Sequence, residues 1–403
     1  MSTERHPRIV SVMEEARVTP LELFFDLVFV FSLTQVTALM AADLTGGGVV
    51  RGMLVLSLLW WCWVGFSWLG SVVRADEGLG RVAMFGAMAA MLVLALSVPE
   101  AFDDLPGGLT GPVVIAIAYL TVRILHLWMF WLVSSEDHLL RHQLVRFLPS
   151  VLGSTALLLV ASQIHGDAQT LTWFAVLAVD YVGTILGGAS GWRLTAAGLF
   201  AERHGLILIV ALGESIVAIG VGVAGSPISA PVIAASVLGL AVAACIWWAY
   251  FDVTSLMAER ALRRAQGEER TRLARDAYSY LHLPMIAGVV LLALGLKKVL
   301  EYVGDDVFHD LSEVLPTLPL AAMFVGVALF VFGNVAFKFR SIRRMSLHRV
   351  VVGVLLLVLI PVAGGMPALA ALGLLAAVMV GLIAFEALRF AEIREQIRHE
   401  EEG

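Results

Sequence analysis

The sequence predicts an all-α membrane protein, a polytopic bundle of about twelve transmembrane helices built as two parallel six-helix repeats. Of its 403 residues, 59% are hydrophobic and only 15% are charged, and the mean hydropathy is +0.88. Soluble globular domains carry about 25% charged and about 45–50% apolar residues. This composition excludes a soluble enzyme, a disordered regulator and a disulfide scaffold.

Twelve apolar segments are long enough to cross the hydrocarbon core, which takes about 20 residues of helix. These segments are 20–42, 48–72, 81–101, 110–134, 143–163, 168–189, 204–224, 230–253, 278–300, 315–337, 346–364 and 367–389. Glycine and proline separate several of them, as in the stretches PGGLTGP, GSPISAP and GGMP. Only a tight turn separates the last two.

Lys and Arg residues concentrate in alternate loops, and this bias predicts the orientation. By our count 23 of the 27 fall on one side, with six in the loop ERALRRAQGEERTRLARD and five in KFRSIRRMSLHR. Arg51, Lys297 and Lys298 fall on the opposite side, and Arg123 lies inside a span. The first 19 residues lack the apolar core and cleavage site of a signal peptide. We therefore expect an inner-membrane protein with both termini in the cytoplasm.

The two halves of the sequence resemble each other. ELFFDLVFVFSLTQVTAL, from Glu22, aligns without gaps on ERHGLILIVALGESIVAI, from Glu202, and LWWCWVGF aligns on IWWAYFDV. The predicted parts are an N-terminal arm at 1–19, a first half at 20–192, a second half at 193–389 with a basic cytoplasmic loop at 259–275, and a tail at 390–403. Repeats of this kind place a pathway between the halves.

Several strings carry a family resemblance. VTPLELFFDLVFVFSLTQVTAL (18–39), the Trp-rich second span, ERHGLILIVALGESIVAIGVG (202–222) and YSYLHLPMIAGVVLLALGL (278–296) together resemble the bacterial low-temperature-requirement protein A family. The resemblance implies a multi-span bacterial membrane protein and names no substrate. The loop GSVVRADEGLGRVAMF departs from the Asn-Arg-Phe-then-acidic stretch usual there, so no role is carried over to it.

A second likeness rests on Phe24, Phe25 and Asp26. They are similar to the Phe-Ser-Asp element of the endosomal–lysosomal potassium channels, although the middle serine is absent. Those channels are also built from six-span repeats, so this weaker likeness favours a channel-like relationship.

Ionisable residues inside the spans are candidates for a substrate or ion pathway, because charges are costly in hydrocarbon. Arg123 either pairs with Glu214 or Asp180 to hold the bundle together, or one of these carboxylates is left for a proton or cation. The whole pathway set is Glu214, Arg123, Asp180, Ser215, Gln35 and His126.

Glu22 and Asp26 lie on one face of the first helix, at its predicted cytoplasmic end. They either stabilise the helix N-terminus or belong to a cytoplasmic-side polar cluster. The members of that cluster are Glu22, Asp26, Glu202, Asp252 and His282. His282 is either a core histidine whose hydrogen bonds are satisfied by the protein or a residue that binds a ligand.

Tryptophans gather in two repeat-equivalent spans. They serve either as packing and interfacial residues or as an aromatic wall for an organic ligand or cation. The wall consists of Trp60, Trp61, Trp63, Trp247 and Trp248.

The leading functional hypothesis is a transporter or channel that moves a small solute or ion between two six-helix halves, with proton coupling through Glu214. One alternative is an intramembrane enzyme or lipid-handling protein that uses Glu214 and His282, and a further alternative is a non-catalytic scaffold. We assign no catalytic residue, metal ligand or cofactor, because no P-loop, HExxH or GxSxG motif is present. Cys62 and Cys245 have no ligand at metal spacing.

The expected partners are the lipid bilayer and an unknown small solute or ion, and no nucleic acid. The oligomeric state is open.

The loop 259–275 is predicted to face the cytoplasm. A cysteine in place of Glu268 should resist a membrane-impermeant maleimide in intact cells and react once the cells are opened. As a control, Asp103→Cys in the opposite acidic loop should react in intact cells. Labelling of position 268 from outside would contradict the orientation.

Overall fold

The computed structural model describes residues 12–135, 137–188, 191–305 and 309–389. In these ranges the regular secondary structure is helical, and isolated bridges occur at Val73 and between Val314 and Pro367. Among the described residues, eleven helical segments are long and apolar enough to cross a membrane, and a twelfth, α13, is a shorter apolar helix of 17 residues. The predicted polytopic helical bundle is therefore confirmed.

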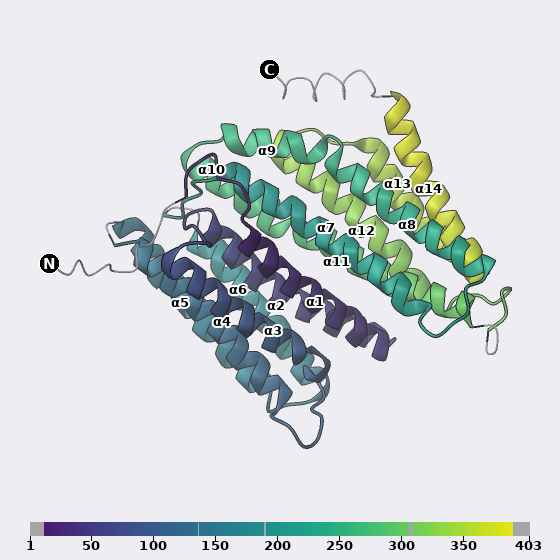
Figure 1. Ribbon diagram of the computed structural model, residues 1–403, viewed down its shortest axis with the longest axis horizontal. Coiled ribbons are helices and arrows are strands. Elements are labelled where there is room, and N and C mark those ends of the chain that lie inside the picture. The colour runs from purple at the N-terminus through teal and green to yellow at the C-terminus, as the bar shows by residue number, and fades with distance from the viewer. Residues whose placement is uncertain (1–11, 136, 189–190, 306–308, 390–403) are drawn as a thin grey trace. The chain divides into compact units, whose positions relative to one another are not determined.

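The helices follow the predicted spans closely (Figure 1). The first group is α1 (Pro20–Ala42), α2 (Gly46–Gly70), α3 (Gly78–Leu96), η1 (Val98–Glu100), α4 (Gly111–Val133), α5 (His138–Ala161) and α6 (Gly166–Gly187). The second group is α7 (Ala197–Gly222), α8 (Ala230–Phe251), α9 (Thr254–Arg264), α10 (Gly267–Leu273), the π-helical turn η2 (Ala274–Tyr280), α11 (His282–Gly304), α12 (Thr317–Ile342), α13 (Leu347–Ala363) and α14 (Ala368–Arg389).

Local sequence fixes the start of α1. The side chain of Thr19 accepts a hydrogen bond from the Glu22 backbone N–H at 3.3 Å, and the Glu22 carboxylate accepts one from the Thr19 N–H at 2.9 Å. Pro20 occupies the first turn, where its missing N–H costs nothing. This reciprocal capping box satisfies two backbone donors and holds Glu22 in one orientation.

The described residues form two compact units. The first contains the chain up to His204 together with Leu262–Arg275, and the second contains Gly205–Ala261 and the chain from Asp276 onward. In the first unit α2 is the central helix. It contacts α1, α4 and α6, and nearly every residue from Leu54 to Gly70 is buried.

In the second unit α11 and α12 form the core, and α8 contacts both of them and α14. The backbones of α11 and α12 approach closely where glycines face each other. A Cβ at Gly326 would lie 2.6 Å from the Gly288 carbonyl oxygen and 2.8 Å from the Leu292 nitrogen. Small residues are used in this way to pack membrane helices.

Several neighbouring helix pairs of the two units correspond under the predicted repeat, although the contact of α8 with α11 is not matched by one of similar extent between α2 and α3. Contacts of α2 with α4 and α6 match those of α8 with α12 and α14, and the chains of contacts α3–α4–α5–α6 and α11–α12–α13–α14 also match. These pairs support the duplication and its halves at 20–192 and 193–389, which stay proposals. Of the predicted arm and tail, residues 1–11 and 390–403 lie outside the described residues.

Replacing Gly326 by alanine should destabilise the second unit, because the added methyl group meets backbone rather than a side chain that can move. We expect a loss of about 1–3 kcal/mol, the usual cost of overpacking. Thermal unfolding of the purified protein in detergent measures it. Gly381→Ala in α14, where a Cβ has no neighbour within 4 Å, is the control, and equal effects of both substitutions would contradict close packing of α11 on α12.

Candidate functional site

Arg123, Arg203 and Arg349 are buried in apolar helices, with exposed fractions of 2%, 0% and 7%. The predicted span 346–364 already contained Arg349, although the loop charge count included it, whereas Arg203 was placed in the loop before the seventh span, and this was wrong. Helix α7 begins at Ala197 rather than at residue 204, so Arg203 lies inside it, and Arg349 lies in the first turn of α13. Because Arg203 and Arg349 both lie near the start of a helix, they stay close to the loops to which they were assigned. The distribution of Lys and Arg among the loops therefore still favours the predicted orientation.

Arg203 binds two carboxylates of α1. Its Nη1 lies 3.4 Å from Glu22 Oε1 and 3.0 Å from the Phe66 carbonyl oxygen, and its Nη2 lies 3.5 Å from Asp26 Oδ1. The guanidinium also stands over the Trp63 ring at 5.6 Å, and Trp63 Nε1–H donates to Asp26 at 2.7 Å. Helices α1, α2 and α7 are therefore joined by one buried polar network, which we call the Arg203 network.

The two expected roles of Glu22 coexist. One carboxylate oxygen caps α1 through Thr19, and the other faces Arg203. Gly70 leaves room for this pair, since a Cβ there would lie 2.6 Å from Glu22 Oε1 and 2.9 Å from Arg203 Nη1. Glu22 also lines a cavity of about 270 Å³ together with Thr19, Gly70 and Arg74.

The charges of the Arg203 network do not balance. Glu22 and Asp26 are each 2% exposed and share one guanidinium. Asp26 Oδ2 has no hydrogen-bond partner among the described residues. A buried carboxylate oxygen without a partner is costly, so this position favours a proton or a cation.

Arg349 is fully paired in the second unit. Its Nε and Nη2 bind the two oxygens of Glu386 at 2.7 and 2.8 Å. Its Nη1 donates to the Ala249 carbonyl at 2.9 Å and to the Asn334 side chain. A bidentate pair with its remaining donors satisfied is a structural ion pair.

Arg123 differs from both. Its Nε and Nη2 have no hydrogen-bond partner among the described residues of its unit. Asp180 instead accepts the Tyr119 hydroxyl and lies 3.2 Å from Ser154 Oγ, and it forms no ion pair with Arg123 in this part of the chain. The Asp180 carboxylate still acts on the charge of Arg123 without a direct ion-pair contact, so the acid that pairs with Arg123 stays open. Glu214 belongs to the second unit, and its pairing with Arg123 stays a prediction.

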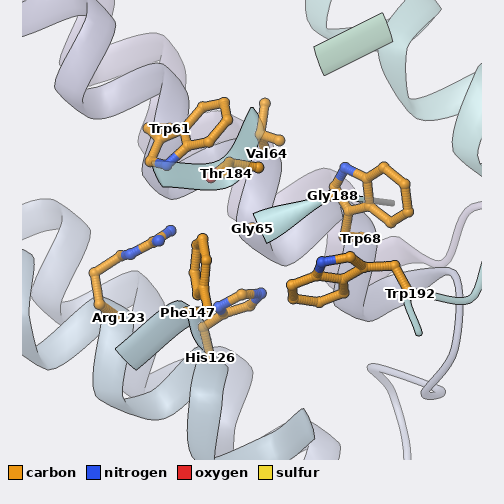
Figure 2. A pocket seen from close by; sticks show the side chains of 10 residues that line it. All are labelled: Trp61, Val64, Gly65, Trp68, Arg123, His126, Phe147, Thr184, Gly188 and Trp192. Atoms are coloured by element: carbon orange, nitrogen blue, oxygen red, sulfur yellow. The ribbon is translucent and has the colours of Figure 1, made fainter. Parts of the chain in front are cut away.

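Arg123 lines an aromatic pocket inside the first unit, which Figure 2 shows from close by. Its wall residues come from α2, α4, α5, α6 and the segment that follows α6. The residues that matter most are Arg123, His126, Trp61, Trp68, Phe147 and Trp192. The cavity measures about 50 Å³, several times the ~10–15 Å³ that one water molecule requires.

His126 lies one turn from Arg123 on α4, so both side chains point into the same pocket, as Figure 2 shows. It is 2% exposed, and no partner meets hydrogen-bond geometry at either ring nitrogen in the described residues, although the Gly65 carbonyl is close. A Cβ at Gly65 would lie 3.4 Å from His126 Nε2 and 3.5 Å from Arg123 Nη1. The backbone of Gly65 therefore lies next to both polar groups, and the absence of a side chain leaves space between them.

The other predicted pathway residues are dispersed. Gln35 is half-buried on α1, in the first unit, whereas Glu214 and Ser215 are buried on α7, in the second. In the cytoplasmic-side set, Glu22 and Asp26 meet through Arg203, while Glu202 is exposed and lies 3.4 Å from the Val18 nitrogen.

Asp252 and His282 both belong to the second unit. Asp252 caps the end of α8 and is half-buried. His282 is fully buried, with Nε2 2.9 Å from the Tyr250 hydroxyl and Nδ1 3.2 Å from the Ala277 carbonyl. This geometry favours the core role of His282 over a ligand role.

The five tryptophans proposed as an aromatic wall lie in different environments. Trp60 and Trp63 stack at 5.0 Å in the core of the first unit, and Trp61 stacks on Tyr181 at 4.2 Å beside the pocket. Trp247 is 45% exposed, as an interfacial tryptophan is, and Trp248 is half-buried.

Sequence reasoning missed Arg203, Phe147 and Trp192 as site residues. For Arg203 a signal was present, since it stands inside the stretch from Glu202 that repeats the first helix. Phe147 and Trp192 carry no local signal, because their places in the pocket depend on how α5 and the segment after α6 pack against α2 and α4.

Comparison with known proteins assigns the architecture to a family. The sequence model of one family, the bacterial low temperature requirement A protein (LtrA), matches residues 17–384 of this chain. An uncharacterized protein of Rhizobium meliloti (strain 1021), RA0937, is 27% identical over 290 residues, which cover 68% of this chain and 67% of that protein. No solved structure matches the chain.

Arg203→Gln should destabilise the protein by about 3–5 kcal/mol, the cost of removing one partner from a buried pair, because Glu22 and Asp26 would lose their cation. Adding Asp26→Asn to this variant should restore part of the loss. Chemical unfolding in detergent measures both. Arg193→Gln is the control: the Arg193 side chain, paired with Asp137, is 65% exposed, so this substitution should cost only about 0–1 kcal/mol. Similar losses at 193 and 203 would contradict the role of the Arg203 network.

Proposed function

The chain belongs to the bacterial low temperature requirement A family, and on that premise we propose that it is a transporter or channel that moves a small solute or ion across the bilayer. The observation that carries the proposal is the Arg203 network, where two buried carboxylates share one guanidinium. Ionisable groups inside membrane helices mark ion pathways and proton relays.

A proton is the ion that fits Asp26. Arg203 and Glu22 would remain as a one-to-one pair when Asp26 is protonated, and the network would then carry no net charge. The cavity of about 270 Å³ beside Glu22 gives water a route to the network from the end of α1 that the loop charges assign to the cytoplasm. In this proposal Asp26 binds a proton and releases it in each transport cycle, and this exchange couples proton movement to movement of the solute.

Passage of the solute between two six-helix halves, and a further protonation at Glu214, belong to the same proposal. Glu214 supports it because it is 1% exposed within α7, far from either helix end. Ser215 beside it has no hydrogen-bond partner for its hydroxyl among the described residues. Placement in the inner membrane with both termini in the cytoplasm completes the proposal.

The alternative of an intramembrane enzyme would require His282 as an acid or base. Both ring nitrogens of His282 lie within hydrogen-bond distance of Tyr250 and Ala277, so a substrate would have to displace protein partners. This arrangement favours transport over acid–base chemistry at His282.

Asp26→Asn should abolish proton-coupled transport while the protein stays folded, because an amide keeps the shape and the Trp63 acceptor but cannot exchange a proton. Glu214→Gln should abolish transport in the same way. The measurement is flux in proteoliposomes with an entrapped pH dye, for a panel of small solutes that protein-free liposomes exclude. Thermal unfolding of each variant checks the fold.

Asp167→Asn, an exposed position on α6, is the matched control and should transport like the wild type. Wild-type flux in the Asp26→Asn protein would remove Asp26 from the proposal. Wild-type protein that behaves like empty liposomes across the whole panel would refute transport itself.

A further inference from the structure

The turn between α12 and α13 lies at the level of the lipid headgroups. Helix α12 ends at Ile342 and α13 begins at Leu347, so the four residues 343–346 join two apolar helices. These helices have 26 and 17 residues, which is within the range that crosses the hydrocarbon core. Because so short a connection cannot extend far from the helix ends, its exposed side chains meet the bilayer surface.

Arg343 in this turn has a backbone conformation that favours glycine. Its φ and ψ are 57° and 26°, and its N–H donates to the Phe339 carbonyl at 2.9 Å, which ends α12. No other non-glycine residue in the described parts of the chain has a positive φ. Glycine is the usual residue at such a helix end, because a Cβ is unfavourable there. An arginine at this position therefore points to a use for its side chain.

Two arginines of the turn carry charges that no described acid meets. Arg343 and Arg344 are exposed, and neither forms an ion pair with a described residue. The stretch KFRSIRRMSLHR, residues 338–349, contains no Asp or Glu. Lys338 is close enough to Arg344 for their charges to repel each other. An anion bound at the turn would offset this repulsion.

The acids that contact this stretch already have cationic partners. Asp276 binds Arg340 at 3.1 Å, and Glu386 binds Arg349 at 2.7 Å. His348 also binds Glu386, at 2.6 Å. Within the described residues of the second unit, neither acid is left for the two arginines of the turn.

Apolar side chains surround these two charges. Met345 is 63% exposed and Leu347 is 67% exposed, and the guanidinium of Arg343 lies 5.8 Å from the ring centre of Phe339. A surface with cationic and apolar side chains side by side matches a lipid, in which a charged phosphate adjoins acyl chains. We infer that this turn binds the headgroup phosphate of an anionic phospholipid through Arg343 and Arg344, with Met345 and Leu347 against the acyl chains.

The general excess of Lys and Arg in loops on one side of a membrane explains less. That excess would be met equally by a glycine at 343 and an arginine at a neighbouring position with ordinary backbone angles. It also gives no reason for exposed apolar side chains beside the charges. A lipid site accounts for the strained position and for the apolar side chains together.

This inference does not depend on transport, so lipid binding is measured without flux. The purified full-length protein in detergent is titrated with phosphatidylglycerol or with phosphatidylcholine of the same acyl chains, and native mass spectrometry counts the bound lipids. We expect one site that prefers phosphatidylglycerol, and a preference that falls as the salt concentration rises. Equal binding of the two lipids would overturn the inference.

Arg343→Gly separates the side chain from the backbone. It should weaken phosphatidylglycerol binding about fivefold, as should Arg344→Gln, since each arginine near an anionic surface contributes about that factor. Arg343→Gly should not lower the thermal unfolding temperature measured without added lipid, because glycine accepts the left-handed conformation. Arg343→Lys keeps the charge and should retain most of the binding.

Arg272→Gln is the matched control, because it removes an exposed arginine whose charge is already met by Glu268 at 2.7 Å. It should bind phosphatidylglycerol like the wild type. An equal loss in this variant would indicate diffuse surface charge and overturn the inference. Wild-type affinity in Arg343→Gly would do the same, and so would a clear loss of stability, which would assign the Arg343 side chain to the fold.

A final arm separates a lipid from a soluble phosphate. Phosphatidylglycerol should stay bound in an excess of glycerol phosphate, because the soluble headgroup lacks the acyl chains that contact Met345 and Leu347. Displacement by glycerol phosphate would contradict the assignment to a lipid.

Discussion

A guanidinium surrounded by apolar helices requires an acceptor for its hydrogen bonds and an anion for its charge, and the polar interior of this protein is arranged around that requirement. In the first unit, Arg203 meets it with two carboxylates of α1 and a backbone carbonyl of α2. In the second unit, Arg349 meets it with Glu386, Asn334 and a carbonyl of α8. Each arginine links helices that are distant in the chain, so each also fixes how its unit packs.

The three buried arginines form a series in which the pairing differs. Arg349 has one bidentate carboxylate, Arg203 has two carboxylates, and Arg123 has the nearby Asp180 without a direct ion-pair contact among the described residues of its unit. A structural pair is complete in the first case, and a negative charge is in excess in the second. The excess of negative charge at Arg203 is what a proton site would need.

Close packing of the helices makes these networks possible. Gly70 lets Glu22 and Arg203 approach the surface of α2, and Gly65 leaves the space between Arg123 and His126. Both glycines lie on α2, the central helix of the first unit. A side chain at either position would crowd these polar groups, so the two glycines let α2 pack against both of them.

The sequence by itself determined the membrane class, the apolar spans, the start of the first span at residue 20 and the candidacy of Arg123, His126, Glu22 and Asp26. These features follow from hydropathy, capping and charge, which act over a few residues of the chain. Only the tertiary structure decided that Arg203 is buried against Glu22, that Asp180 bonds to Tyr119, and that Phe147 and Trp192 wall the pocket of Arg123. The physical reason is that such pairings depend on the rotation of each helix about its axis and on which distant helices it packs against, and neither quantity is encoded in any local stretch of sequence.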